Sequence, residues 1–423
     1  RAPRPVNPAA APAACSPRAG PPYFSLSAKG RQSALKGKSS TVCGHGPVHS
    51  RGRRSGRHLR ADFRRLLPAP PPSRPRHRHA GYLAVDGGTV KVTSEGDGVD
   101  AATDLVVTGG ELSVSSTAAD DSSAHGLTSG VITVLEGGTV DVDSSADAVH
   151  SDAAVHVSGA VVTVSAGDDG VHAEGDLVIS KGSLKVTKSN EGLEGKDILV
   201  SGGSVTVTAG DDGVNASGST TSSSDQGGQG GGGGGGGGGG ESVGDYTAKV
   251  TGGTLVINAD GDGFDSNGTA EITGGTVVVN GPGRNGNGAL DVNGSFTISG
   301  GTLLAAGSAG MAVAPDTESG QGWVSATLDS AVEAGTTLHV VDSDGKVVAS
   351  FVTSKTIQNV VYSGDGIKSG EKYAIYVGGG TGSGSGSDTG GLAAEAGDLG
   401  SAEEVATVTA GDAPEGGFGG GMR

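Results

Sequence analysis

A glycine pair, or a close variant of it, followed by alternating apolar residues recurs nine times along this chain and limits the possible folds. The first copy reads GGTVKV from Gly87, and the last reads GGTLLA from Gly300. The second residues of the nine pairs are 88, 110, 138, 160, 182, 203, 253, 275 and 301, so the commonest step is 22 residues. A fixed period of this length is typical of solenoids, whose repeats bury their apolar residues against neighbouring repeats.

Each period holds three short strand-like segments. After the glycine pair comes a motif such as DGVD at Asp97, and before the next pair comes a motif such as DLVVTG at Asp104. In GGTVKV, Val90 and Val92 fall on one face of a strand, because side chains alternate along it. Helices would need a period of 3.6, and antiparallel sandwiches do not keep a 22-residue register. The repeat therefore predicts an all-β chain with a parallel β-helix of about 22 residues per coil over 81–310.

Composition agrees with thin stacked strands. Aromatic residues make up only 3% of the chain, so its core must use Val, Ile, Leu and Ala. The 83 glycines suit corners at which the backbone needs positive φ or close approach to the next coil.

The repeat is interrupted once and is flanked by other sequence types. Residues 217–245 are rich in Ser and Gly and are predicted to form a disordered insertion. Residues 311–379 keep strand-like alternation without the period, which predicts a β-rich cap over the open end of the helix. We expect residues 1–80, an Arg/Pro-rich extension, and 380–423, a Gly-rich tail, to be disordered.

Charge divides the chain into two unlike parts. Residues 1–80 contain 17 basic residues and one acid, Asp62, whereas the remainder contains 12 bases and 45 acids. The acidic part makes nucleic acid an unsuitable partner and favours cations. Both cysteines, Cys15 and Cys43, lie in the basic part, and no segment has the composition of a signal peptide or a membrane span.

Stacking converts the acidic motifs into rows, because equivalent residues of adjacent coils lie about 4.8 Å apart. One row, here called the corner row, contains Asp97, His125, Asp147, Asp169, Glu191, Asp212 and Asp262. A second, the strand row, lies three residues further on and contains Asp100, Thr128, His150, His172, Glu194, Asn215, Asp265 and Asp291.

Carboxylates at this spacing repel one another unless a cation neutralises them. Calcium binds oxygen ligands at about 2.3–2.6 Å, which suits carboxylates one coil apart. The predicted calcium ligands are Asp168, Asp169, Glu191, Asp211 and Asp212, with Asp260, Asp262 and Asp265 as a second group. The alternative is that Asp-Gly is only the corner chemistry of the fold, with carboxylates solvated or bonded to turn amides.

Two other residue pairs have a chemical interpretation. His150 and His172 stack in adjacent coils and could bind a transition metal, although polar side chains on an outward face are the preferred interpretation. Lys181 and Lys185 lie near the first calcium group, as a base in a calcium-dependent polysaccharide lyase would. The alternative is that these lysines only offset negative charge.

The segments GDGVDA, GDDGVHAEGDLVISKGSLKV and GDDGVNASG, the glycine-run insertion and KSGEKYAIYVGG together resemble the bacterial carbohydrate-binding domain family. The resemblance covers roughly residues 84–379. It implies a right-handed parallel β-helix similar to that of pectate lyases, bound calcium on the Asp-Gly corners, and an extracellular or cell-surface location. It also implies non-catalytic binding of polysaccharides such as polygalacturonate and cellulose.

The leading interpretation is thus a monomeric, calcium-dependent protein that binds an acidic polysaccharide. Trp323, Tyr82, Tyr246 and Phe264 are the few aromatic residues that could stack on sugar rings, and core or cap packing is the preferred role for each. The first alternative is the calcium-dependent lyase. The second is a structural or adhesive surface protein without a sugar ligand.

Overall fold

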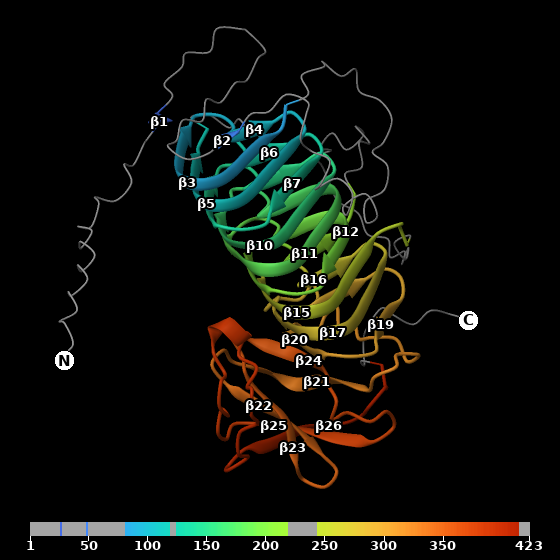
Figure 1. Ribbon diagram of the computed structural model, residues 1–423. Helices are drawn as coiled ribbons and strands as arrows, with labels where there is room; N and C mark the ends of the chain where they lie inside the picture. The colour runs from blue at the N-terminus through green and yellow to red at the C-terminus, as the bar shows by residue number, and fades with distance from the viewer. Residues whose placement is uncertain (1–25, 28–47, 50–80, 119–123, 219–242, 414–423) are drawn as a thin grey trace, which may run out of the picture.

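The computed structural model describes residues 26–27, 48–49, 81–118, 124–218 and 243–413. These residues form β-strands joined by turns, with one short 3-10 helix, η1 (Ser387–Thr389), and no α-helix. No helix in these ranges is long and apolar enough to cross a membrane. Figure 1 shows a stack of strands from β3 (Leu83–Ser94) to β20 (Thr302–Gly307), with a second β-rich unit below its C-terminal end. The all-β prediction is confirmed.

Each coil of the stack has three sides. Strands that run through two sides and the glycine corner between them are β3, β5 (Asp104–Ser116), β10 (Ala154–Ser165), β11 (Val171–Lys188), β15 (Thr247–Ala259) and β17 (Thr269–Asn280). The same path is split in β7 (Ile132–Leu135) and β8 (Thr139–Ser144), β12 (Leu193–Val200) and β13 (Ser204–Ala209), and β19 (Phe296–Ile298) and β20.

The third side consists of short strands, completed by the N-terminal ends of β11 and β12. They are β4 (Val99–Ala101), β6 (Leu127–Ser129), β9 (Val149–Ser151), β14 (Val214–Ala216), β16 (Phe264–Ser266) and β18 (Leu290–Val292). Two further strands, β1 (Leu26–Ser27) and β2 (Val48–His49), pair with β3.

The coils stack in parallel and in register. One inward column of the second side contains Val90, Leu112, Val140, Val162, Leu184, Val205, Leu255, Val277 and Leu303, each paired with the next. All of these residues are buried, so adjacent coils share one continuous apolar core. The result is a parallel β-helix of about nine turns with about 22 residues per turn, as the repeat predicts.

The second glycine of the repeat turns the corner between the first and second sides. Its φ lies between 76° at Gly88 and 89° at Gly182 wherever that position is glycine. At Gly253, where φ is 80°, a Cβ atom would also lie 2.7 Å from the carbonyl carbon of Gly202 in the coil before. Positive φ and close backbone contact together explain why this position of the motif is glycine.

The cap begins by extending the β-helix. β24 (Ile357–Ser363) pairs antiparallel with β20 on one side and with β21 (Trp323–Val332) on the other. A second sheet has the order β23 (Val347–Val352), β22 (Thr337–Asp342), β25 (Lys372–Val377), β26 (Glu403–Thr409). β24 therefore covers the exposed edge of the last coil.

The predicted disordered tail at 380–423 is wrong for residues 380–413, because β26 completes the sheet of the cap by pairing with β25. Gly390 has a φ of 60°, and its carbonyl oxygen accepts a hydrogen bond of 3.1 Å from the side-chain amide of Asn280. Glycine there allows the chain to pack closely on the outer surface of the β-helix. The cap therefore extends beyond residue 379.

Several predicted segments lie outside the described residues. These are most of 1–80, residues 219–242 of the insertion at 217–245, and 414–423. At the two ends of the insertion the register is continuous, since β14 pairs directly with β16 and β12 with β15.

Candidate functional site

The two polar rows lie side by side along the corner between the second and third sides of the β-helix. Every neighbouring pair of the strand row is in parallel register, from Asp100 beside Thr128 to Asp265 beside Asp291. Most members of both rows are half-buried, and Asp147 and Asp169 are buried. Stacking thus partly shields a continuous line of polar and mostly ionisable side chains from solvent.

Aspartates of the corner row bond to the backbone of the next coil. The Oδ1 atom of Asp147 accepts from the amide of Asp169 at 3.2 Å, and Oδ1 of Asp212 accepts from the amide of Asp262 at 2.7 Å. Asp262 repeats the contact with the amide of Gly288 at 2.6 Å. One oxygen of each carboxylate therefore satisfies a turn amide, as the alternative interpretation expects, and the second oxygen remains for another partner.

Histidines accompany the acids in the N-terminal half of the rows. The Oδ2 atom of Asp147 lies 2.9 Å from Nδ1 of His150, 3.4 Å from Nδ1 of His125 and 3.7 Å from Nδ1 of His172. The imidazole rings lie next to one another, tilted by 41° with centroids 5.1 Å apart for His125 and His150, and edge to face with centroids 4.9 Å apart for His150 and His172. Three imidazoles thus surround one carboxylate oxygen.

These contacts lower the pKa of Asp147 and raise the pKa values of His150 and His172. Burial disfavours the charged form of Asp147, but the three imidazoles outweigh burial and hold the pKa of Asp147 well below its usual range. Burial also opposes protonation of His150, but Asp147 and Asp152 outweigh it and raise the pKa of His150 to about 9. Asp147 and Asp169 together raise the pKa of His172 to about 11.

Acids predominate in the C-terminal half of the rows. Burial, followed by repulsion among the carboxylates, raises the pKa of Asp212 and of Asp262 to about 6. The same causes raise the pKa of Asp265 to about 8, with repulsion from Asp291 the largest charge effect. Burial raises the pKa of Glu191 as well. When ionised, the carboxylates of this half would therefore carry more negative charge than their neighbours neutralise.

One amide in the acidic half has an oxygen without a partner. Asn215 donates from Nδ2 to Oε2 of Glu191 at 2.9 Å, whereas its Oδ1 atom is buried and accepts no hydrogen bond from the residues that the structure describes. Asn215 pairs with Asp265 in the strand row. A buried carbonyl oxygen beside unneutralised carboxylates matches the donor set that calcium prefers.

The predicted calcium ligands fall into three situations. Asp169 and Glu191 form a compact triad with Glu194, whose ligand atoms lie within 4.8 Å of one another. Asp212, Asp262 and Asp265 are half-buried members of the two rows. The remaining three are exposed: Asp168, Asp211 and Asp260.

Asp260 has a different partner, which the sequence does not reveal. Nζ of Lys355, in the cap, lies 2.6 Å from Oδ1 of Asp260. This ion pair ties the cap to the last coils and leaves Asp260 with a structural role.

Lys181 and Lys185 both lie on β11 and are exposed. They project from the first and second sides of the coil, whereas the polar rows follow the corner after the second side. No described ion pair joins either lysine to a carboxylate of the rows. The aromatic candidates Trp323 and Phe264 are buried in the core.

The period of the repeat places His125, Asp147 and Glu194 in the two rows, but none of them is among the predicted ligands. The compact groups of three in the described residues are His125–Asp147–His150, Asp147–Asp169–His172 and Asp169–Glu191–Glu194. The register places the members of each group in adjacent coils, but the contacts among them also depend on side-chain orientation, which the register does not determine.

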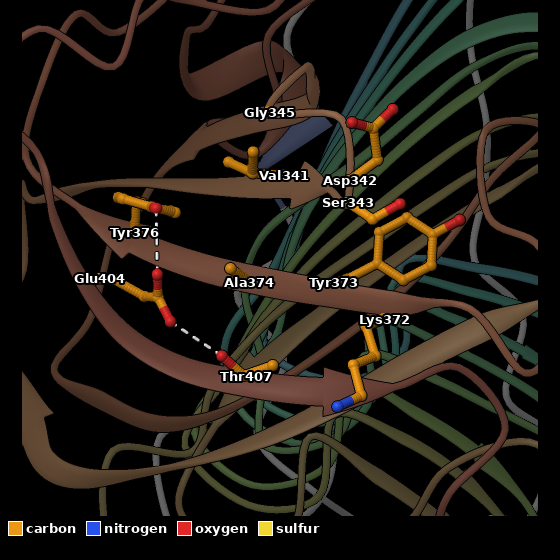
Figure 2. A pocket seen from close by; sticks show the side chains of 10 residues that line it. All are labelled: Val341, Asp342, Ser343, Gly345, Lys372, Tyr373, Ala374, Tyr376, Glu404 and Thr407. Atoms are coloured by element: carbon orange, nitrogen blue, oxygen red, sulfur yellow. Dashed lines mark hydrogen bonds between the residues drawn. The ribbon is translucent and has the colours of Figure 1, made fainter.

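The cap has a hollow of about 270 Å³ on its outer sheet, which the sequence did not indicate. Figure 2 shows Tyr376, Glu404 and Thr407 side by side, with Lys372 and Asp342 towards the other end. Glu404 accepts hydrogen bonds from Tyr376 at 3.0 Å and from Thr407 at 2.8 Å. The polar groups of Tyr376, Glu404 and Thr407 are thus paired with one another.

Comparison with known proteins agrees with the resemblance found in the sequence. Residues 74–170 and 162–232 match a family model described as carbohydrate-binding domain-containing protein. The matched residues include the coils that contain the histidine cluster and the first calcium group. No curated protein and no solved structure matches the chain.

Proposed function

We propose that this chain, whose N-terminal coils match the carbohydrate-binding domain family, is a non-catalytic binding protein for an acidic polysaccharide, with calcium as the bridging ion. The family match supports polysaccharide as the class of ligand. We place the protein outside the cell or on its surface, where such polymers occur.

Calcium explains the acidic half of the polar rows better than solvation does. Asp212, Asp262 and Asp265 have raised pKa values, so their charges lack full compensation. The buried Oδ1 atom of Asn215 adds a neutral oxygen among them. Calcium would neutralise these carboxylates and take its remaining ligands from water or from a glycan carboxylate.

The rows also suit a linear polymer. Equivalent side chains repeat about every 4.8 Å along the stack, so an extended polyanion could contact several calcium-bearing coils at once. Several weak contacts on one chain add through effective concentration. Polygalacturonate, which has a carboxylate on each sugar, is the ligand class that we favour, with cellulose as the second.

The test measures retention of the full chain on immobilised polygalacturonate with calcium and after chelation. Retention with calcium and its loss on chelation are expected. The variant Asp212→Asn/Asp265→Asn should reduce calcium-dependent retention at least about tenfold, because each change removes a charged ligand. The matched control Asp329→Asn/Asp344→Asn removes two exposed charges of the cap and should retain normal binding.

The same incubation separates the alternatives. Ultraviolet absorbance from an unsaturated product would identify a lyase and contradict the proposal, and Lys181→Ala and Lys185→Ala would then test the base. Absence of both retention and product at every calcium concentration would favour a structural protein. Retention on neutral cellulose without calcium would keep carbohydrate binding but reject the calcium bridge.

A further inference from the structure

We propose that His125, Asp147 and His150 form a binding site for a transition-metal dication of the zinc class, separate from the acidic half of the rows. Each of the three residues offers a ligand atom there, and Oδ2 of Asp147 faces Nδ1 of His125 and Nδ1 of His150. The three ligand atoms, one from each residue, lie within 4.8 Å of one another, and the residues belong to two adjacent coils.

The spacing fits tetrahedral coordination. Zinc binds imidazole nitrogen and carboxylate oxygen at about 2.0–2.2 Å, so two ligand atoms of a tetrahedron lie about 3.3–3.5 Å apart. Oδ2 of Asp147 lies 3.4 Å from Nδ1 of His125 and 2.9 Å from Nδ1 of His150. Small movements would open the second distance, and water would complete the coordination.

An unsatisfied nitrogen points to a ligand at this place. Nδ1 of His125 is buried and makes no hydrogen bond within the described part of the chain. Buried polar atoms normally have a partner, and each exception requires an explanation. A metal ion between His125 and Asp147 would satisfy this nitrogen, which the protein alone leaves at 3.4 Å from the carboxylate.

The surroundings hold the ligands in a suitable orientation. The backbone amide of Asp169 binds Oδ1 of Asp147, which fixes the carboxylate and directs Oδ2 towards the histidines. Nε2 of His150 lies 3.7 Å from Oδ1 of Asp152, so a carboxylate stands behind the imidazole. A carboxylate behind a histidine ligand sets the tautomer that offers the other nitrogen to a metal.

Donor chemistry distinguishes this site from the calcium site. Imidazole nitrogen suits zinc, copper and nickel, whereas calcium prefers oxygen ligands throughout. The buried atom that has no hydrogen-bond partner in the described residues is a nitrogen, Nδ1 of His125, in the histidine half and an oxygen, Oδ1 of Asn215, in the acidic half. Binding of the transition metal would displace the proton that the imidazole–carboxylate pair holds in its absence.

The experiment measures zinc binding to the metal-free full chain by equilibrium dialysis in millimolar calcium, with the zinc-induced change in melting temperature as a second readout. Zinc should bind and raise the melting temperature. His125→Gln and His150→Gln should each weaken binding at least about tenfold and remove the thermal shift. His156→Gln is the matched control, because His156 faces Ser180 rather than the cluster.

A thermal shift that persists in His125→Gln/His150→Gln would overturn the proposal. Zinc held by Cys15, Cys43 or the histidines of residues 1–80 would give that result, since those residues are untouched. If either variant fails to fold without metal, electron paramagnetic resonance of Cu²⁺ bound to the unmodified chain identifies the ligand atoms instead. Two imidazole nitrogens are expected, and coordination by oxygen or sulfur alone would contradict the site.

Discussion

Asp265 shows how stacking changes the chemistry of a single residue. Its pKa is raised to about 8, first by burial and then by repulsion from Asp291, Asp212 and other acids. An isolated surface aspartate would be ionised above about pH 4. At Asp265, ionisation requires either a bound cation or a cost in folding free energy.

This shift predicts a pH dependence of stability without calcium. Between the ordinary pKa and about 8, the folded protein binds a proton at Asp265 that the unfolded chain does not, so stability falls as pH rises. Asp212 and Asp262, raised to about 6, act in the same direction at lower pH. We expect the melting temperature of the chelated protein to decline from pH 5 to pH 8, and calcium to reduce the decline.

Asp265→Asn isolates the residue. It should stabilise the chelated protein at pH 8 by on the order of 1–3 kcal/mol, with little effect at pH 4, because the amide resembles the protonated acid. Asp344→Asn, at an exposed position of the cap, should leave the pH profile unchanged. A wild-type melting temperature that stays constant from pH 5 to pH 8 in chelator would contradict the argument.

At the scale of strands and corners, the repeat predicted most of the architecture. The inward residues and the two polar rows follow from the period alone, because parallel stacking places residues one period apart in contact. Pairing within the rows did not follow from it. Which imidazole meets which carboxylate, as for His150 and Asp147, depends on side-chain orientation, and the period does not determine orientation.

The sequence of the strands also contains a signal for the place where the cap packs. Early coils have polar residues at the outward position of the second side, such as Lys91 and Thr206. Later coils have Val256, Val278 and Leu304 at that position, and all three are buried against the cap. The change from alternating to continuous apolar residues marks where a second layer packs. It would have indicated that the cap wraps around the side of the stack.

The glycine corner yields a graded stability prediction. Gly253→Ala should lower the melting temperature most, because it combines positive φ with backbone contact. Gly345→Ala has a similar φ of 81° but open space, and should cost about 1–2 kcal/mol of folding free energy. Gly96→Ala has open space and no positive φ, and should be nearly neutral. Equal melting temperatures for the Gly253 and Gly345 variants would show that the close contact can relax.

For the whole molecule, the cap determines where the stack ends. β24 occupies the edge of β20, and the cap covers the outward valines of the last coils. Exposed edges and apolar patches lead to self-association. Because an open edge has to be covered, a cap could be expected from the sequence. Strand alternation indicated a cap that ends at residue 379, whereas the cap extends to residue 413 because β26 belongs to its sheet.

Truncation tests this role. A chain that ends at residue 310 should associate into larger species, because it exposes the edge of β20 together with Val278 and Leu304. A chain that ends at residue 413 keeps the complete cap and should have the oligomeric state of the full chain. Light scattering after size-exclusion chromatography provides the measurement, and a 1–310 chain that matches the full chain in state and melting temperature would refute the prediction.

The continuous register across the insertion has a consequence for how such a chain can change over generations. β14 pairs with β16, and β12 with β15, although the step between glycine pairs is 50 residues there instead of 22. Added length at that corner leaves the neighbouring coils in place, because loop-closure entropy grows slowly with length. Selection on folding therefore acts weakly on the length of this corner. It is a position at which foreign sequence, such as a reporter or an epitope, could be spliced into the protein while the pairing of β12 with β15 and of β14 with β16 is kept.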